Sequence, residues 1–133
     1  MYLSLINLNR EREYGIFIIE GGHRFNGDLI QQGAKNEALE VLCVTLLTPE
    51  EVKIYNIPDI LDVNNLIQLL RALGVTVKRI GLNAYSFKAD KINLDYRDSD
   101  DFFQKGASLR GSVMIIGPLV ARFGYGVLPK PGG

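Results

Sequence analysis

The sequence predicts an α/β fold in which the helices are buried. Short β-branched and aromatic runs alternate with longer apolar runs, which is the pattern of strands alternating with helices. The helical runs are apolar around most of their circumference, as in helices covered on several sides. Setting 33–34 over 106–107 aligns two such runs about 73 residues apart, and one unit of this faint repeat runs β-α-β-α-β-β. We therefore expect one full unit and the start of a second.

Two strands are expected before the first helix. Residues 16–20 are β-branched and aromatic and end at Gly21-Gly22, and residues 28–32 follow the turn Asn26-Gly27. Residues 1–15 join a short alternating stretch to a charged run. We interpret them as a divergent or artificially added leader, which leaves 16–133 as the folded part.

Two helices follow. The first is expected over 34–47, with a stop at 48–50 and a half-exposed strand at 52–57. The second has Asp62 as its expected N-cap and Gly74 as its C-terminal stop. Its apolar positions fall on one stripe at helical spacing: Val63, Leu66, Ile67, Leu70 and Leu73.

Strands are then expected at 75–80 and 84–88, with a further short one at 92–94. The acidic stretch 95–101 is expected to be a loop that leads to another helical segment.

The last apolar run covers 113–120. Gly117 and Pro118 should bend or split it, and Gly124 should end it. Residues 125–128 are expected to start another strand.

Composition excludes several classes of protein. Apolar residues make up 47% of the 133 and charged residues 23%, with 15 basic against 15 acidic side chains. A net charge of zero argues against a general binder of nucleic acid or membrane surfaces. No apolar run approaches the roughly 18 residues that span a bilayer, and the start lacks the basic segment of a secretory signal. A cytoplasmic location is therefore expected.

Neither Cys43 nor His23 predicts a reactive or metal site. One cysteine cannot form an intramolecular disulfide, and Cys43 lies in an apolar helix, where a buried, inert thiol is expected. His23 lacks cysteine, histidine or carboxylate partners at ligand spacing, so no metal site is expected.

Lys35 is the side chain that most clearly indicates a ligand. It opens the first helix after Gly33, where unpaired N–H groups and partial positive charge disfavour a cation by about 0.3–1 kcal/mol. An anion would satisfy both the lysine and the backbone. Arg110 repeats the arrangement after Gly106-Ala107-Ser108-Leu109. The two positions predict a site for a phosphate or a carboxylate.

Six segments in fixed order carry a resemblance to a known family. They are 19–28, 33–36, 46–48, 56–63, 69–75, and 109–112 with 116–124. Together they resemble the N-terminal portion of the UDP-N-acetylglucosamine enolpyruvyltransferases, and the likeness extends over residues 16–133.

The resemblance implies an enolpyruvyl transferase-like, inside-out α/β barrel built from βαβαββ units, with helices inside and sheets outside. It implies transfer of the enolpyruvyl group of phosphoenolpyruvate to UDP-N-acetylglucosamine with release of phosphate, the first committed step of peptidoglycan precursor synthesis. These two metabolites are the implied partners. No metal or organic cofactor is implied.

The same resemblance assigns substrate-binding roles to three residues. Lys35 matches the family lysine that contacts phosphoenolpyruvate, Asn36 is its neighbour in that site, and Arg110 matches an arginine at the substrate site. Fixed cations and backbone N–H groups can hold both anionic groups of this substrate in line for reaction.

The family's general acid, a cysteine or an aspartate, would follow Gly133. No catalytic residue is therefore expected within the chain, which we interpret as an incomplete piece, inactive by itself.

Two alternatives stay open. A 3-phosphoshikimate 1-carboxyvinyltransferase relative usually has Lys-Ser where this chain has Lys35-Asn36. A truncated, non-catalytic interaction module would expose apolar area and tend to self-associate.

Overall fold

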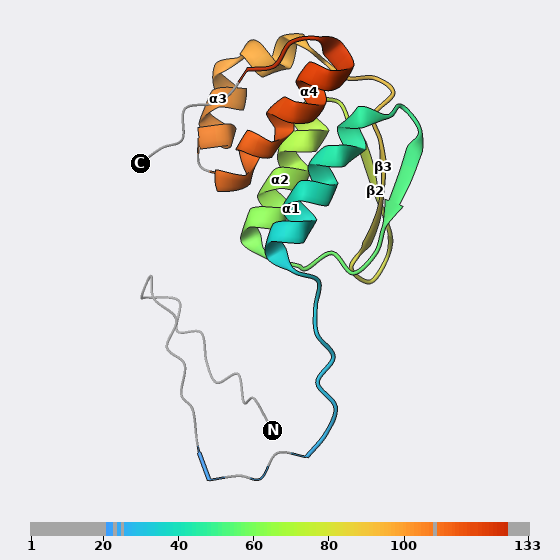
Figure 1. Ribbon diagram of the computed structural model, residues 1–133, viewed down its shortest axis with the longest axis vertical. Helices are drawn as coiled ribbons and strands as arrows, with labels where there is room; N and C mark the ends of the chain where they lie inside the picture. Colours follow the sequence, from blue (N-terminus) through green and yellow to red (C-terminus); the bar gives the residue numbers. More distant parts are fainter. Residues whose placement is uncertain (1–20, 23, 25, 108, 128–133) are drawn as a thin grey trace. The chain divides into compact units, whose positions relative to one another are not determined.

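The computed structural model describes residues 21–22, 24, 26–107 and 109–127. The chain divides into two compact units, residues 1–31 and 32–133. The described residues of the first unit form no regular helix or strand. The second unit is mixed α/β, with a three-stranded sheet and helices packed beside it (Figure 1).

The strand expected at 28–32 is absent from the structure. These residues are irregular, and the side chains of Leu29 and Ile30 are 90% and 92% exposed. Residues with high strand propensity form a strand only where the backbone pairs with another strand and one face is buried. Within the described residues, 28–32 have neither a pairing strand nor a buried face. The strand expected at 16–20 lies outside the described residues.

The first helix forms where the sequence predicts it. Helix α1 covers Lys35–Val44 and continues into a 3₁₀ turn, η1, over Thr45–Leu47. Its inner face, Ala38, Leu39, Leu42 and Cys43, is buried. Burial on several sides is not seen within the described residues, because Val41, Val44 and Leu47 stay partly exposed.

Helix α2 covers Leu61–Ala72, and all five positions of its predicted apolar stripe are buried. It ends in a Schellman motif: Gly74 N–H donates to the Arg71 carbonyl oxygen and Val75 N–H to that of Leu70, at 2.9 and 3.0 Å. Gly74 takes φ of 99°, so the predicted glycine stop is confirmed.

The N-cap prediction for Asp62 is wrong. Ile60 has the extended backbone of an N-cap residue, and Asp62 lies within the first helical turn. The helix starts earlier because the side chain of Asn64 donates to the Asp59 carboxylate at 2.7 Å and ties the preceding turn to the helix.

Strands β1 (Glu51–Ile54), β2 (Thr76–Gly81) and β3 (Ala84–Lys88) form one sheet in the order β1-β3-β2. Central β3 is antiparallel to both neighbours. Val52, Phe87 and Val77 share one row of the register, and Phe87 is buried in the core. Figure 1 shows α1, α2 and α4 on one side of this sheet.

The strand expected at 92–94 does not form. The Asn93 side-chain oxygen accepts from the N–H groups of Asp95 and Tyr96, at 3.2 and 3.3 Å. This local turn competes with an extended backbone and starts the 3₁₀ helix η2, Asp95–Asp98.

The acidic stretch 95–101, expected to be a loop, is therefore largely helical. Helix α3 covers Asp100–Ala107, and the Ser99 hydroxyl accepts from Phe102 N–H at 3.2 Å as an N-cap. The carboxylates of Asp100 and Asp101 then lie in the first turn, where the helix dipole favours them.

The predicted split of the last apolar run is confirmed. A 3₁₀ segment, η3, covers Arg110–Ile115, and helix α4 covers Ile116–Phe123. Pro118 lies in the first turn of α4, where its missing N–H costs nothing. Gly124, with φ of 74°, ends the helix. Residues 125–127 form no strand, and Leu128 lies outside the described residues.

We predict that Gly74→Ala destabilises the chain by about 1–3 kcal/mol, because the residue has positive φ. An added Cβ would also lie 2.3 Å from the Lys91 carbonyl oxygen. Gly117→Ala is the matched control: its Cβ would meet nothing within 4 Å, and alanine should be neutral or up to about 1 kcal/mol better in a helix. Urea denaturation of both variants checks this, and equal midpoints would contradict it.

Candidate anion site

The N-terminal ends of two helices and one 3₁₀ segment meet around a surface hollow of about 340 Å³. Helix α1 contributes one side, the first turn of α2 contributes Asp62, and η3 contributes two residues. The lining residues are Lys35, Asn36, Leu39, Glu40, Asp62, Gly111 and Met114. Two of the three predicted site residues, Lys35 and Asn36, therefore face the same space.

Helix α1 and η3 approach each other closely beside the hollow. A Cβ on Gly111 would lie 3.1–3.4 Å from the side-chain carbons of Leu39. Any larger residue at this position would push η3 away from α1 and widen the hollow. Gly111 therefore sets the spacing of the two elements that carry the predicted site residues.

Lys35 already has an anionic partner in the structure. Its ammonium group forms an ion pair with the Asp62 carboxylate, and the two side chains are 51% and 39% exposed. The pair joins the first turn of α1 to the first turn of α2. The unfavourable position of the cation at a helix N-terminus is thus offset by a residue of the chain itself, which the sequence analysis did not foresee.

The first turn of α1 still offers backbone donors. Ala34 is the N-cap and makes no side-chain capping hydrogen bond, and the first helical bond runs from Ala38 N–H to the Ala34 carbonyl oxygen at 3.0 Å. The N–H groups ahead of Ala38 have no intrahelical acceptor. Amide donors, the Lys35 ammonium group and the Asn36 side chain therefore lie at one end of the hollow.

The third predicted residue, Arg110, opens η3 next to Gly111. Its backbone is thus adjacent to the hollow, while its side chain lies outside the part of the molecule that the structure describes. The Asp101 carboxylate, in the preceding helix α3, already has partners: it accepts from the Tyr96 hydroxyl at 2.5 Å and from Lys105 at 2.6 Å. These two hydrogen bonds, that of Lys105 first, lower the pKa of Asp101.

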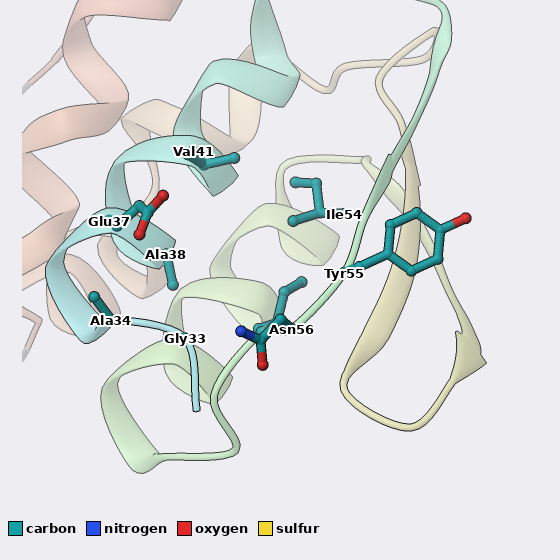
Figure 2. Close-up of a pocket in the computed structure, with 9 residues that line it drawn as sticks. Gly33, Ala34, Glu37, Ala38, Val41, Ile54, Tyr55 and Asn56 are labelled. Atoms are coloured by element: carbon teal, nitrogen blue, oxygen red, sulfur yellow. The ribbon is translucent and has the colours of Figure 1, made fainter. Parts of the chain in front are cut away.

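A second hollow, of about 140 Å³, lies beside the start of α1 and the end of β1 (Figure 2). Ala34, Ala38, Val41 and Ile54 give it a mostly apolar lining. Glu37 is its one acid among the described residues, and none of the predicted site residues line it. Its chemistry does not match an anion.

The part of the chain that the structure describes has neither a cluster of metal-ligating side chains nor a helix that could cross a membrane. Residues 21–22, 24, 26–107 and 109–127 contain no group of three or more histidine, cysteine, aspartate or glutamate side chains that could hold a metal. In the same residues, no helix combines the length and apolar character needed to cross a membrane. His23 is outside them.

Asp62 is the residue of this site that the sequence analysis missed. Its sequence signal was ambiguous, because an acidic residue at a helix start serves equally as an N-cap, a dipole partner or an ion-pair partner. The choice depends on the position of Lys35, which is 27 residues away along the chain and comes close only through the packing of α1 on α2.

The chain is similar to known enolpyruvyl transferases. The family model of EPSP synthase (3-phosphoshikimate 1-carboxyvinyltransferase) matches residues 19–129. The chain belongs to this family. Its backbone is similar to the crystal structure of the enolpyruvyl transferase NikO from Streptomyces tendae, with a TM-score of 0.61 and 24% identity over 78% of this chain and 23% of that one. This likeness shows the fold.

Relatives with higher sequence identity are UDP-N-acetylglucosamine 1-carboxyvinyltransferases. Those of Bacteroides thetaiotaomicron and Bacteroides fragilis are 62% identical over 117 residues, and that of Porphyromonas gingivalis is 56% identical. Each alignment covers 88% of this chain and 27% of the relative. The resemblance seen in the sequence is confirmed, and the chain spans about a quarter of the length of these relatives.

We predict that Cys43 resists alkylation in the folded chain. Burial raises the pKa of its thiol from 9.0 to about 12, because the thiolate would lose its hydration. Iodoacetamide at pH 8.5 should therefore label it at least about 100-fold more slowly than after unfolding in urea. Since the folded-state pKa is the higher one, the neutral thiol contributes stability below about pH 9, and this is lost as pH rises toward 12. Stoichiometric labelling of the native chain within minutes would contradict this.

Proposed function

We propose that this chain forms the phosphoenolpyruvate-binding portion of a UDP-N-acetylglucosamine 1-carboxyvinyltransferase. The observation that carries the proposal is the 56–62% identity to proteins of that name over 88% of the chain. The reaction transfers the enolpyruvyl group to the sugar nucleotide and releases phosphate. The proposal includes the cytoplasmic location expected from the sequence.

The proposed substrate-binding residues are Lys35, Asn36 and Arg110. Phosphoenolpyruvate carries a phosphate and a carboxylate. The hollow combines an ammonium group and an amide side chain with the start of a helix, whose first backbone N–H groups have no intrahelical acceptor. Arg110, next to Gly111, would bring a second cation to the same space. Asp62 would hold the Lys35 side chain beside the hollow until an anionic ligand arrives.

The finer architecture is also a proposal. The observed order α1-β1-α2-β2-β3 accounts for five of the six elements of a βαβαββ unit of an inside-out barrel. Helices α3 and α4 would begin the next unit. Residues 16–133 would form this portion, preceded by the leader 1–15.

A chimaera tests the function and the role of Lys35 together. Residues of this chain replace the matching 117-residue segment of the Bacteroides thetaiotaomicron enzyme, and phosphate release is measured with both substrates. We expect an active chimaera, and Lys35→Ala should lower kcat/KM for phosphoenolpyruvate about 10²–10³-fold, because it removes a preorganised cation. Lys53→Ala, in the exposed part of β1, is the control and should change nothing.

Two results would count against these assignments. A folded but inactive chimaera contradicts the function, and unchanged kinetics of Lys35→Ala contradict the role of Lys35. The shikimate alternative is tested by the reciprocal chimaera in a 3-phosphoshikimate 1-carboxyvinyltransferase. Activity there, without activity in the first chimaera, would reverse the assignment.

Exposed apolar side chains support self-association of the isolated 133-residue chain. Besides Leu29 and Ile30, Leu61 and Leu82 are 73% and 84% exposed. Large apolar side chains left in water favour association between copies. We expect light scattering to show species larger than a monomer at about 100 μM, a concentration at which micromolar self-affinity is populated. A stable monomer there would contradict this and weaken the interaction-module alternative.

A further inference from the structure

The chain reverses direction after α4 and runs back along it (Figure 1). Gly124 takes a left-handed conformation, and its N–H donates to the Val120 carbonyl oxygen at 2.9 Å. Gly126 then lies so close to α4 that a Cβ would be 3.1 Å from Ile116 and 3.2 Å from Val120. We call residues 124–127 the exit segment.

One side chain from elsewhere in the sequence holds the exit segment. The Arg97 guanidinium donates to the Tyr125 carbonyl oxygen at 3.2 Å, and its centre lies 4.4 Å from the centroid of the Tyr125 ring. The first contact fixes the backbone and the second fixes the side chain of the same residue. A cation over an aromatic face adds about 0.5–1 kcal/mol at an exposed site and more where water is excluded.

The Arg97 side chain is largely buried where it contacts Tyr125. Its side chain is 15% exposed, and its buried Nε forms no hydrogen bond within the described residues. Nε lies 3.7 Å from an Asp98 carboxylate oxygen, which is close enough for an ion pair but too far for a hydrogen bond. Burial removes water from Nε, and no hydrogen bond replaces it, which costs free energy. The contacts of Arg97 with Tyr125 help to offset this cost.

Arg122, which lies in α4 itself, has a different role from Arg97. It donates to the carbonyl oxygens of Leu46 and Ala89, both at 2.9 Å, and so ties α4 to η1 and to the end of β3. Arg122 therefore fixes the helix within the unit. Arg97 instead contacts Tyr125, in the chain that follows the helix.

We infer that Arg97 is a positioning residue that sets the direction in which the chain leaves α4. Two contacts of Arg97 to Tyr125 and the close packing of Gly126 on α4 hold the exit segment in place. Without Arg97, Gly126 still packs on α4, but Tyr125 loses its hydrogen bond and its cation–π contact. The exit segment then loosens while the rest of the unit stays folded.

Limited proteolysis of the 133-residue chain with chymotrypsin tests this directly. Cleavage after Tyr125 should be at least about fivefold faster in Arg97→Ala, while cleavage after Tyr55, which follows β1 and is 67% exposed, stays the same. Arg97→Lys keeps the charge but lacks the planar guanidinium, and should fall between the two. Arg79→Ala is the matched control, since Arg79 also donates to a backbone carbonyl oxygen, that of Gly81.

An unchanged rate after Tyr125 would overturn the inference. Equal acceleration after Tyr55 and Tyr125 would also overturn it, because it would mean general unfolding.

A second measurement rests on the proposed function. In the active chimaera, Arg97→Ala should lower kcat about tenfold and leave KM for phosphoenolpyruvate unchanged. KM should not change because Arg97 does not line the hollow. The value of kcat should fall because the chain that follows the exit segment must be correctly placed for reaction. Unchanged kcat would overturn the positioning role. If the parent chimaera is inactive, the proposed function fails, and the cleavage rates still decide whether Arg97 holds the exit segment.

Discussion

The burial of α2 determines where the candidate site lies. This helix contacts α1, α3, η3 and β2, and its apolar stripe is buried against them. Burial of five such side chains stabilises the unit by about 1.5–3 kcal/mol each. With α2 fixed in this way, the first turn of α1, the first turn of α2 and the start of η3 are brought to one place. The hollow is therefore a consequence of core packing.

A site at helix N-termini has useful chemistry before any charged side chain is considered. Each first turn presents N–H groups that have no partner inside the helix. Because α1 and α2 both start beside the hollow, an anion there would meet two such turns. The Lys35–Asp62 pair joins these turns across the gap. At half exposure such a pair adds no more than about 1 kcal/mol to stability, so its significance lies in where it holds the lysine.

Local patterns in the sequence predicted the elements whose stabilising contacts are local or strictly periodic. The stripe from Val63 to Leu73 and the stop at Gly74 define α2, and the expected strand 84–88 forms with the same bounds. The strand predicted at 28–32 was wrong, because a strand also needs a neighbouring strand to pair with, and the composition of the segment does not show whether one is present. At Asn93 a side chain competes with the backbone for hydrogen bonds, and a propensity pattern does not register that competition.

The same distinction applies to the candidate site. The N-terminal position of Lys35 is a local property, and in the structure Lys35 and Asn36 line one hollow. Their role in binding stays a prediction. The partner of Lys35 depends on how α1 packs on α2, which is not encoded locally. Arg97 shows the limit most clearly, since its contact with Tyr125 joins residues 28 positions apart and leaves no periodic signal.

Charge balance limits how tightly the hollow, as the structure describes it, would bind the proposed substrate phosphoenolpyruvate. The described lining of the hollow carries one cation, Lys35, and two carboxylates, Glu40 and Asp62, so its net charge is negative. At separations of about 4 Å and an effective dielectric constant near 20, each carboxylate would oppose an anion by about 4 kcal/mol before screening. Arg110 would restore neutrality at most. A substrate with two anionic groups requires further cations, and the relatives have nearly three quarters of their length outside the matched segment in which to supply them.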